Sequence, residues 1–258
     1  MALETLEHFL NHRLAKLLNR YRRERIGAPL PIDLEELAKF AGVLSVEGQE
    51  MIPEAVVTVE ESGFRIYLQS NYANQPGIRI RQRFSLAHEI AHTFFYEEIN
   101  GVLKPMRDAL RGTKLESACY QAAGLLLVPE EFLREELSKI SEPFSVEQVL
   151  PLSRMFDVSV EVILRRLVEH GVFDSRQLTP ILARAGKIEF ALYPPLLKSC
   201  VSEPRRGTDF SEWFGKHAVQ IETLANGALR RTSREGVVLA RSSIHIGPEM
   251  RLWELKRL

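Results

Sequence analysis

The sequence predicts an α+β protein built from more than one folded unit. Up to about residue 174 the apolar residues recur mostly at helical spacing. Beyond that point, short alternating runs lie between turn signals, a pattern typical of strands. A chain of 258 residues, 45% of them hydrophobic, is long enough to bury a core without a disulfide framework.

The composition excludes several classes of protein. Lysine and arginine together number 34, as do aspartate and glutamate, so no overall charge predicts binding to nucleic acid or to a membrane surface. The two cysteines, Cys119 and Cys200, are too few for a disulfide scaffold and lack metal-ligand spacing. No apolar run approaches 18 residues and charged residues interrupt the N-terminus, so we expect a cytoplasmic protein without a membrane span or signal peptide.

Periodicity and capping predict the first elements. Leucines at helical spacing predict a helix over residues 3–25, and its basic end is typical of a helix C-terminus. Asp33 fits the N-cap of a short helix that Gly42 ends. The alternating runs 55–59 and 64–68 predict two strands of a hairpin.

Helices are expected through the middle of the chain. The first covers residues 83–98, and a polar loop with two glycines and a proline separates it from a second at 114–127. Residues 145–156 and 159–170 then predict a helix-turn-helix-like unit. Within it, Pro151 either kinks the first helix or marks its start.

The last part of the chain predicts a β-rich domain. A short helix reaching Gly186 comes first. The expected strands are residues 188–193, 219–224, 228–232, 237–246 and 251–255. From these changes of pattern we expect three parts: residues 1–140, the helix-turn-helix-like unit at 141–174, and a small β-rich α+β domain at 175–258 with a sensory or substrate-docking role.

The strongest chemical signal is the motif His-Glu-x-x-His at residues 88–92. Because His88 and His92 are four residues apart, both imidazoles lie on one helix face and can reach one zinc ion. Glu89 follows the first histidine and can accept a proton from water at that ion. The alternative is that the histidines are surface neighbours with an incidental glutamate between them.

A catalytic zinc site usually needs a third protein ligand. Phe95 and Glu98 stand where the metzincin pattern requires glycine and histidine, so the same helix does not supply the ligand in that way. Glu116 is the best candidate, because small residues near it allow two helices to approach closely. Glu97, Glu98 and Asp108 remain alternatives.

Several segments resemble the ImmA/IrrE family of zinc-dependent peptidases. Residues 83–92 read Arg-Phe-Ser-Leu-Ala-His-Glu-Ile-Ala-His, and residues 116–129 begin with Glu-x-x-Cys-Tyr and end with Leu-Leu-Leu-Val-Pro. Residues 31–38 and 152–167 resemble further parts of the family, so the similarity covers about residues 29–173. The departures are Cys119, Tyr120 and Ala122, where the family usually carries alanine, asparagine and phenylalanine.

The resemblance implies an N-terminal zincin-like metallopeptidase domain that binds one Zn²⁺ per chain. It implies that His88, His92 and Glu116 are the ligands and that Glu89 is the general base. It also implies a site-specific endopeptidase whose protein partner is a helix-turn-helix transcriptional repressor, cleaved to switch on a stress-response or mobile-element regulon. Tyr120 is a candidate transition-state stabiliser, although a packed aromatic is equally consistent with the sequence.

Two other functions remain open: a non-catalytic accessory protein of a repressor or toxin–antitoxin pair, and a DNA-binding regulator. An idle site would not need Glu89, and the mixed charges of residues 145–173 lack the basic footprint of a recognition helix, so direct DNA binding is not favoured. For a substrate, we expect strand 64–68 to be the sheet edge that pairs with an extended segment. The helix-turn-helix-like unit and the basic tail would provide additional contacts.

Overall fold

The computed structural model divides the chain into two compact units. One comprises Met1–Ser138 with Arg154–Ser159, and the other comprises Lys139–Ser153 with Val160–Leu258. The boundaries that we predicted at residues 140 and 174 stay predictions. The structure describes residues 3–24, 30–70, 78–106, 110–140, 148–172, 179–184, 187–191, 206–216, 218, 220–223, 228–233, 236–245 and 250–257.

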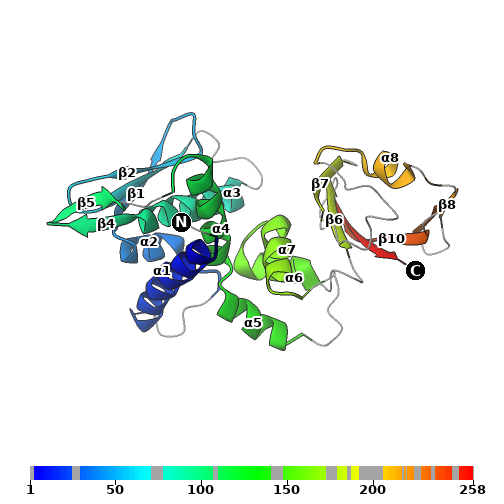
Figure 1. Cartoon of the computed structure of the whole chain (residues 1–258), viewed down its shortest axis with the longest axis horizontal. Coiled ribbons are helices and arrows are strands. Elements are labelled where there is room, and N and C mark those ends of the chain that lie inside the picture. Colours follow the sequence, from blue (N-terminus) through cyan, green and yellow to red (C-terminus); the bar gives the residue numbers. More distant parts are fainter. Residues whose placement is uncertain are drawn as a thin grey trace. The chain divides into compact units, whose positions relative to one another are not determined.

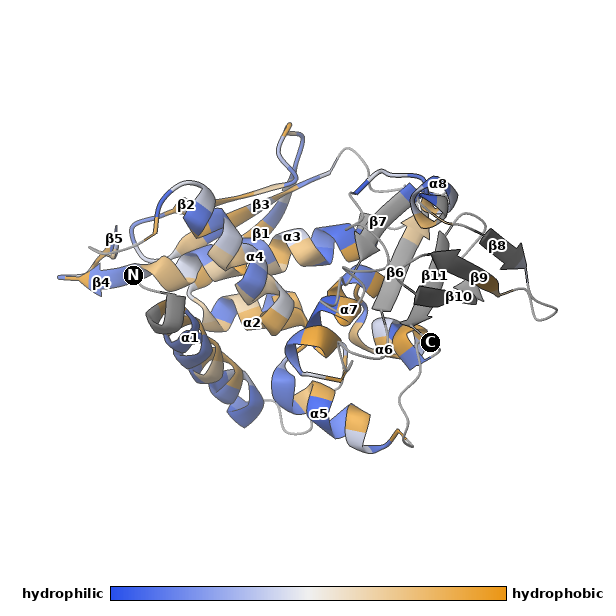
Figure 2. Cartoon of the chain, turned by 45° about the vertical axis from the view of Figure 1, so that its right-hand side comes forward, coloured by the Kyte–Doolittle hydropathy of each residue, from blue (hydrophilic) through white to orange (hydrophobic). Residues whose placement is uncertain are grey.

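The first unit begins with two helices, as the sequence predicts (Figure 1). α1 (Leu3–Glu24) is amphipathic and buries one row of residues, namely Leu10, Leu14, Leu17, Leu18 and Tyr21. The colours of Figure 2 show the contrast between its hydrophilic and hydrophobic sides. α2 (Leu34–Phe40) is capped by Asp33, whose carboxylate accepts a hydrogen bond from the Glu36 backbone N–H.

A three-stranded sheet follows, with the strand order β1-β3-β2. β2 (Ala55–Val59) and β3 (Phe64–Gln69) form the predicted antiparallel hairpin, whereas β1 (Val43–Gln49), which the sequence analysis did not predict, pairs in parallel with β3. β3 is therefore the central strand, and the expectation that strand 64–68 forms an edge is wrong. β1 takes the place beside β3 because their ladder satisfies the backbone groups on that side of β3.

The predicted helix 83–98 is displaced toward the N-terminus. α3 (Ile78–His92) ends at the second histidine of the motif, and a buried 3₁₀ turn (Thr93–Phe95) follows it. The Thr93 hydroxyl donates to the Ile90 carbonyl oxygen at 2.7 Å, a local bond of the kind that competes with helix continuation.

A hairpin replaces the expected end of that helix and the first part of the predicted polar loop. β4 (Tyr96–Ile99) and β5 (Val102–Pro105) are antiparallel. Asn100 and Gly101 between them both have positive φ, which is typical of a two-residue hairpin turn. The Asn-Gly pair is a hairpin signal that our sequence analysis overlooked.

α4 (Thr113–Leu127) agrees closely with the predicted helix 114–127 and packs against α3. Its small residues are on the buried side: Ala118, Cys119, Ala122 and Ala123 are at most 2% exposed. They allow the close approach of the two helices that the sequence predicted. α5 (Glu130–Ser138) comes directly after Pro129 and was not predicted.

The two predicted helices of the helix-turn-helix-like unit are present as α6 (Val149–Phe156) and α7 (Val160–Glu169). Pro151 lies in the first turn of α6, so it marks the start of that helix and does not kink it. The predicted start of the first helix, at residues 145–147, lies outside the described residues. Asp157, in the turn between these helices, has a φ of 52°.

The second unit contains a six-stranded antiparallel sheet of order β7-β6-β11-β10-β9-β8. Its strands are β6 (Thr179–Arg184), β7 (Lys187–Ala191), β8 (Gln220–Thr223), β9 (Leu229–Ser233), β10 (Gly236–His245) and β11 (Met250–Arg257). Strands were expected at five of these places, but β6 replaces the predicted helix that reached Gly186. Pairing of β6 with β7 and β11 satisfies its backbone from both sides, which a local helical pattern does not reveal.

One short helix of this unit was not predicted. α8 (Phe210–Gly215) is capped by Asp209, which accepts from the Glu212 backbone N–H, and it buries Phe210, Trp213 and Phe214. None of the helices in the described part of the chain combines the length and apolar character that a membrane span requires.

Candidate metal centre

Three potential metal ligands converge between α3 and α4. The Nε2 atom of His88 lies 3.1 Å from Glu116 Oε2 and 3.2 Å from His92 Nε2, and His92 Nε2 lies 3.7 Å from Glu116 Oε1. One ligand atom from each residue lies within 4.8 Å of the other two. The structure thus brings together the three residues that the sequence analysis suggested as metal ligands.

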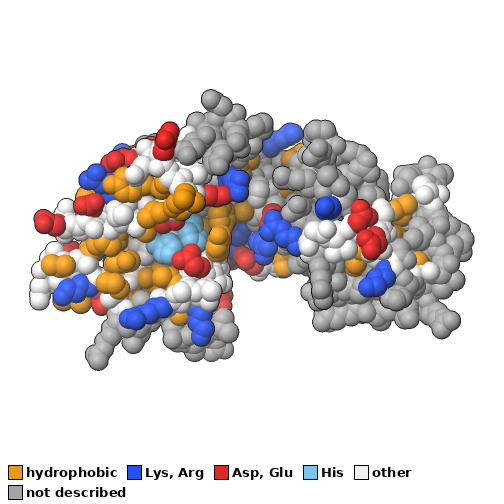
Figure 3. Space-filling model, turned by 90° about the horizontal axis from the view of Figure 1, so that it is seen from above, with side chains coloured by type: hydrophobic (Ala, Val, Ile, Leu, Met, Phe, Trp, Pro, Cys, Tyr) orange, Lys and Arg blue, Asp and Glu red, His pale blue; other side chains and the backbone are white. Residues whose placement is uncertain are grey.

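Local structure explains this convergence. His88 and His92 are one turn apart on α3, so their rings point the same way and their centroids are 4.9 Å apart. Glu116 lies in the first turn of α4, which packs against α3 through small residues. Figure 3 shows histidine side chains open to solvent on this unit, next to acidic side chains and bordered by hydrophobic ones.

The donor set fits a divalent transition-metal ion such as zinc. Burial lowers the pKa of His88 and of His92, so both imidazoles favour the neutral form that binds metal. Two imidazoles and one carboxylate are the ligand types of catalytic zinc sites. His88 Nδ1 is buried and has no hydrogen-bond partner among the described residues, whereas His88 Nε2 faces the ligand atoms of His92 and Glu116. We therefore place the ring proton on Nδ1, so that Nε2 can bind the metal.

Glu89, next to His88 on α3, contacts strand β2 of the sheet. It is only 8% exposed, and its Oε2 atom accepts a hydrogen bond from the backbone N–H of Val57 in β2 at 2.9 Å. Burial raises the pKa of Glu89 to about 7, although the Val57 bond opposes this shift and the charge of Glu116 adds to it. A carboxylate with that pKa can accept and release a proton near neutral pH.

The sequence did not predict the role of Val57. Val57 lies opposite Ile66 on β3. The Glu60 N–H donates to the Gly63 carbonyl and the Gln69 N–H donates to the Glu54 carbonyl, and in the alternating pattern of an antiparallel ladder this makes Val57 and Ile66 a pair without mutual hydrogen bonds. The amide of Val57 therefore points away from β3 and toward α3. No local residue pattern indicates such a contact, because it depends on which strand lies beside the helix.

Tyr120 lies against the first histidine. Its ring centroid is 4.5 Å from that of His88 and 5.7 Å from that of Phe84, and the side chain is 58% exposed. The structure shows an aromatic contact, and a role of the hydroxyl as transition-state stabiliser stays a prediction. Cys119, the residue before Tyr120, is fully buried, and burial raises the pKa of its thiol, which disfavours the reactive thiolate.

The other candidates for the third ligand do not join this group. Glu97 and Glu98 lie on β4, beyond the end of α3, and neither belongs to the cluster of donors found among the described residues. Asp108 lies outside the described residues.

A comparison with protein families agrees with this geometry. Residues 74–168 match the model of the peptidase M78 family, described as an IrrE N-terminal-like domain. This segment belongs to the ImmA/IrrE family. The IrrE-like domain spans α3, α4 and the three clustered residues, and it indicates a metallopeptidase-type function. The resemblance of residues 31–38 lies outside the matched segment. No curated protein matches the chain.

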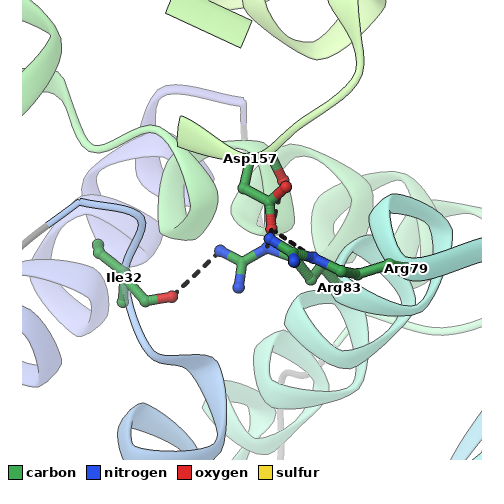
Figure 4. A network of polar contacts seen from close by, with 4 residues as sticks. All are labelled: Ile32, Arg79, Arg83 and Asp157. Carbon is green, nitrogen blue, oxygen red and sulfur yellow. Dashed lines mark hydrogen bonds and ion pairs between the residues drawn. The ribbon is translucent and has the colours of Figure 1, made fainter. Parts of the chain in front are cut away.

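A polar network also holds α3 through Arg79 and Arg83 (Figure 4). These arginines lie nine residues before His88 and His92, respectively, and therefore on the opposite face of α3. The Arg83 guanidinium donates to the backbone oxygens of Ile32 and Asp157 at 3.1 and 3.2 Å. The Asp157 carboxylate also accepts from Arg79 at 2.6 Å and lies 3.2 Å from Arg83 Nε. This network, which we call the Asp157 clamp, joins α3 to the segment before α2 and to the turn after α6.

Proposed function

We propose that the protein is a zinc-dependent, site-specific endopeptidase whose ligands are His88, His92 and Glu116 and whose general base is Glu89. The observation that carries this proposal is the buried Glu89 carboxylate beside three converging metal-ligand atoms. A zinc ion held there would supply a Lewis acid that polarises the scissile carbonyl and activates water.

The residues of the chain account for the proton transfers. Glu89 Oε2 is held by the Val57 amide, which leaves Oε1 to take a proton from the attacking water and deliver it to the leaving amine. Water thereby adds across the peptide bond, and a carboxylate and an amine are released. Tyr120 could add a hydrogen bond to the developing oxyanion, which a Tyr120→Phe variant would test.

We propose that the substrate segment pairs with β2. This strand is an edge of its sheet and lies beside α3, and the alternation that turns the Val57 amide outward also turns the backbone of Ala55 and Val59 outward. An extended segment can add to such an edge by backbone hydrogen bonding. This replaces the expectation for strand 64–68.

The proposed partner is a helix-turn-helix transcriptional repressor in the cytoplasm, whose cleavage switches on a stress-response or mobile-element regulon. The resemblance to the ImmA/IrrE family supports this part of the proposal. Direct DNA binding is not favoured by α7, where Arg165 and Arg166 bind Glu161 and Glu169 of the same helix.

The test compares the zinc-loaded wild-type chain with Glu89→Gln. The amide keeps the shape of the side chain but cannot accept the proton of water, so cleavage should fall by a factor on the order of 10²–10⁴ while zinc stays bound. Both proteins are incubated with a native cell extract that contains the candidate repressors, and newly formed protein N-termini are labelled and sequenced.

We expect a small set of new N-termini, from one repressor, with the wild-type chain alone. Equal cleavage by Glu89→Gln would contradict the assignment of the base. Stoichiometric zinc without any new N-terminus would favour the accessory-protein alternative. Rapid digestion of unfolded casein would contradict the proposed selectivity.

A further inference from the structure

Tyr120 is a large aromatic side chain left in solvent beside the candidate metal centre. It is 58% exposed, whereas its neighbour Cys119 on α4 is fully buried. Exposed apolar surface at a site, unlike a scattered exposed residue, commonly marks a place where a ligand binds.

The ring is held in place by two residues of α3. Phe84 stacks on it with an interplanar angle of 27°, and His88, one turn farther along α3, contacts it at a centroid distance of 4.5 Å. On α4, Tyr120 lies one turn after Glu116. The ring is thus fixed beside two of the three ligand residues before any substrate arrives.

A group bound at the cluster must pass close to this ring. Tyr120 contacts His88 from α4, and Glu89, the residue after His88, contacts the outward edge of β2. A peptide that pairs with β2 and presents its carbonyl to the cluster therefore has side chains within reach of the Tyr120 ring. An aromatic or other bulky apolar side chain gains most from such a surface, through burial and ring stacking.

We propose that Tyr120 is a specificity-determining residue, whose ring, backed by Phe84, receives the bulky apolar or aromatic side chain next to the scissile bond. This inference rests on the proposed function and names the class of residue that the site selects. It assigns the recognition to the ring, so the hydroxyl is not required for it.

The test uses two small metal chelators that differ only in their side group. Acetohydroxamate carries a methyl group and benzohydroxamate carries a phenyl ring, and both bind zinc through the same hydroxamate atoms. Their affinities for the zinc-loaded chain are measured by calorimetry, and the ratio of the two dissociation constants gives the preference for phenyl. An aromatic pair should raise this ratio by about 2- to 13-fold over that of a chain without the ring.

The comparison uses five proteins. The wild-type chain and Tyr120→Phe should show the same phenyl preference, whereas Tyr120→Ala and Tyr120→Leu should lose it while still binding one zinc. Val102→Ala, which truncates an exposed apolar residue of the β4–β5 hairpin, is the matched control and should keep the preference. The leucine variant retains apolar packing against α3 if the alanine variant does not fold.

The outcomes separate the inference from the proposed function. A zinc-loaded chain whose phenyl preference survives both Tyr120→Ala and Tyr120→Leu overturns the inference alone. Loss of the preference in Tyr120→Phe overturns the assignment to the ring. A wild-type chain that binds no zinc overturns the proposed function, and this inference with it.

Discussion

Single residues at the candidate centre combine costly burial with a specific partner. Glu89 is 8% exposed, which is unfavourable for an ionised carboxylate, and it accepts a hydrogen bond from the Val57 amide. His88 is buried with an unsatisfied Nδ1 atom. Perturbed groups of this kind are concentrated at functional sites, which is the physical reason for assigning chemistry to them.

Removing one imidazole should remove the metal. We expect His88→Ala to reduce bound zinc from about one ion per chain to near zero, because a single imidazole and one carboxylate are too few ligands for a tetrahedral site. Elemental analysis after dialysis measures the stoichiometry. His170→Ala, which changes a histidine outside the cluster, is the control and should keep the zinc. Stoichiometric zinc in His88→Ala would place the site elsewhere.

At the scale of elements, α3 is fixed on both sides. α4 and β2 contact the side that carries the candidate site, and the Asp157 clamp holds the opposite side. Periodicity in the sequence located α1, α2 and α4 well, because their apolar rows and caps are local features. It misplaced the end of α3, because the hairpin at Asn100 and Gly101 competes for the same residues.

The Asp157 clamp should contribute measurably to the stability of the first unit. Asp157→Gly keeps the left-handed backbone but leaves the half-buried Arg83 without its carboxylate, so we expect a loss of about 1–3 kcal/mol in the free energy of unfolding. Asp157→Ala should lose about 1–2 kcal/mol more, because alanine disfavours that backbone. Urea denaturation measures both losses.

The exposed pair of Arg134 and Glu130 on α5 provides the control for the clamp. Arg134→Ala should change the stability by no more than about 0.5 kcal/mol. If Asp157→Gly lowers the free energy of unfolding by no more than Arg134→Ala does, the clamp contributes only as much as a surface ion pair.

The three-stranded sheet depends on the absence of a side chain at Gly63. A Cβ atom there would lie 2.5 Å from the Gly42 carbonyl oxygen and 2.8 Å from Leu44 Cγ. Gly63→Ala should therefore destabilise the unit by about 1–3 kcal/mol in the same measurement. Gly48→Ala is the matched change in β1, where the new Cβ would meet only Ser70 at 3.6 Å, and it should be nearly neutral. Equal effects of the two variants would contradict the close packing.

On the scale of the whole molecule, the candidate centre belongs entirely to one of the two compact units. Its residues lie on α3, α4 and β2, and the described part of the six-stranded sheet contributes none of them. A ligand that binds only one folded unit stabilises that unit directly. The role of the second unit stays a prediction.

Calorimetry should separate the two units. We expect two unfolding transitions, of which only one moves to higher temperature when zinc is added. The stabilisation should reach about 2.7 kcal/mol when free zinc is about 100 times its dissociation constant. A chelator should reverse the shift, and His88→Ala should not show it. A single transition that moves as a whole would contradict the independence of the units.

The sequence by itself predicted α1, α2, α4, α6 and α7 and the residues that cluster at the candidate centre. His88, Glu89 and His92 lie within one helical turn of one another, so spacing alone places them together, and small residues on α4 indicated why Glu116 approaches. Signals of this kind are local or nearly local. Such local signals can be recognised in the sequence without knowledge of the rest of the fold.

Only the tertiary structure decided which strand is an edge, which amide faces Glu89 and where Asp157 binds. β1 occupies the place beside β3 and leaves β2 next to α3, while Arg83 meets Asp157 across 74 positions of the chain. β6 likewise becomes a strand through its pairing with β7 and β11. These contacts join backbone groups and charges distant in sequence, and no periodicity reports which of many possible pairings has the lowest free energy.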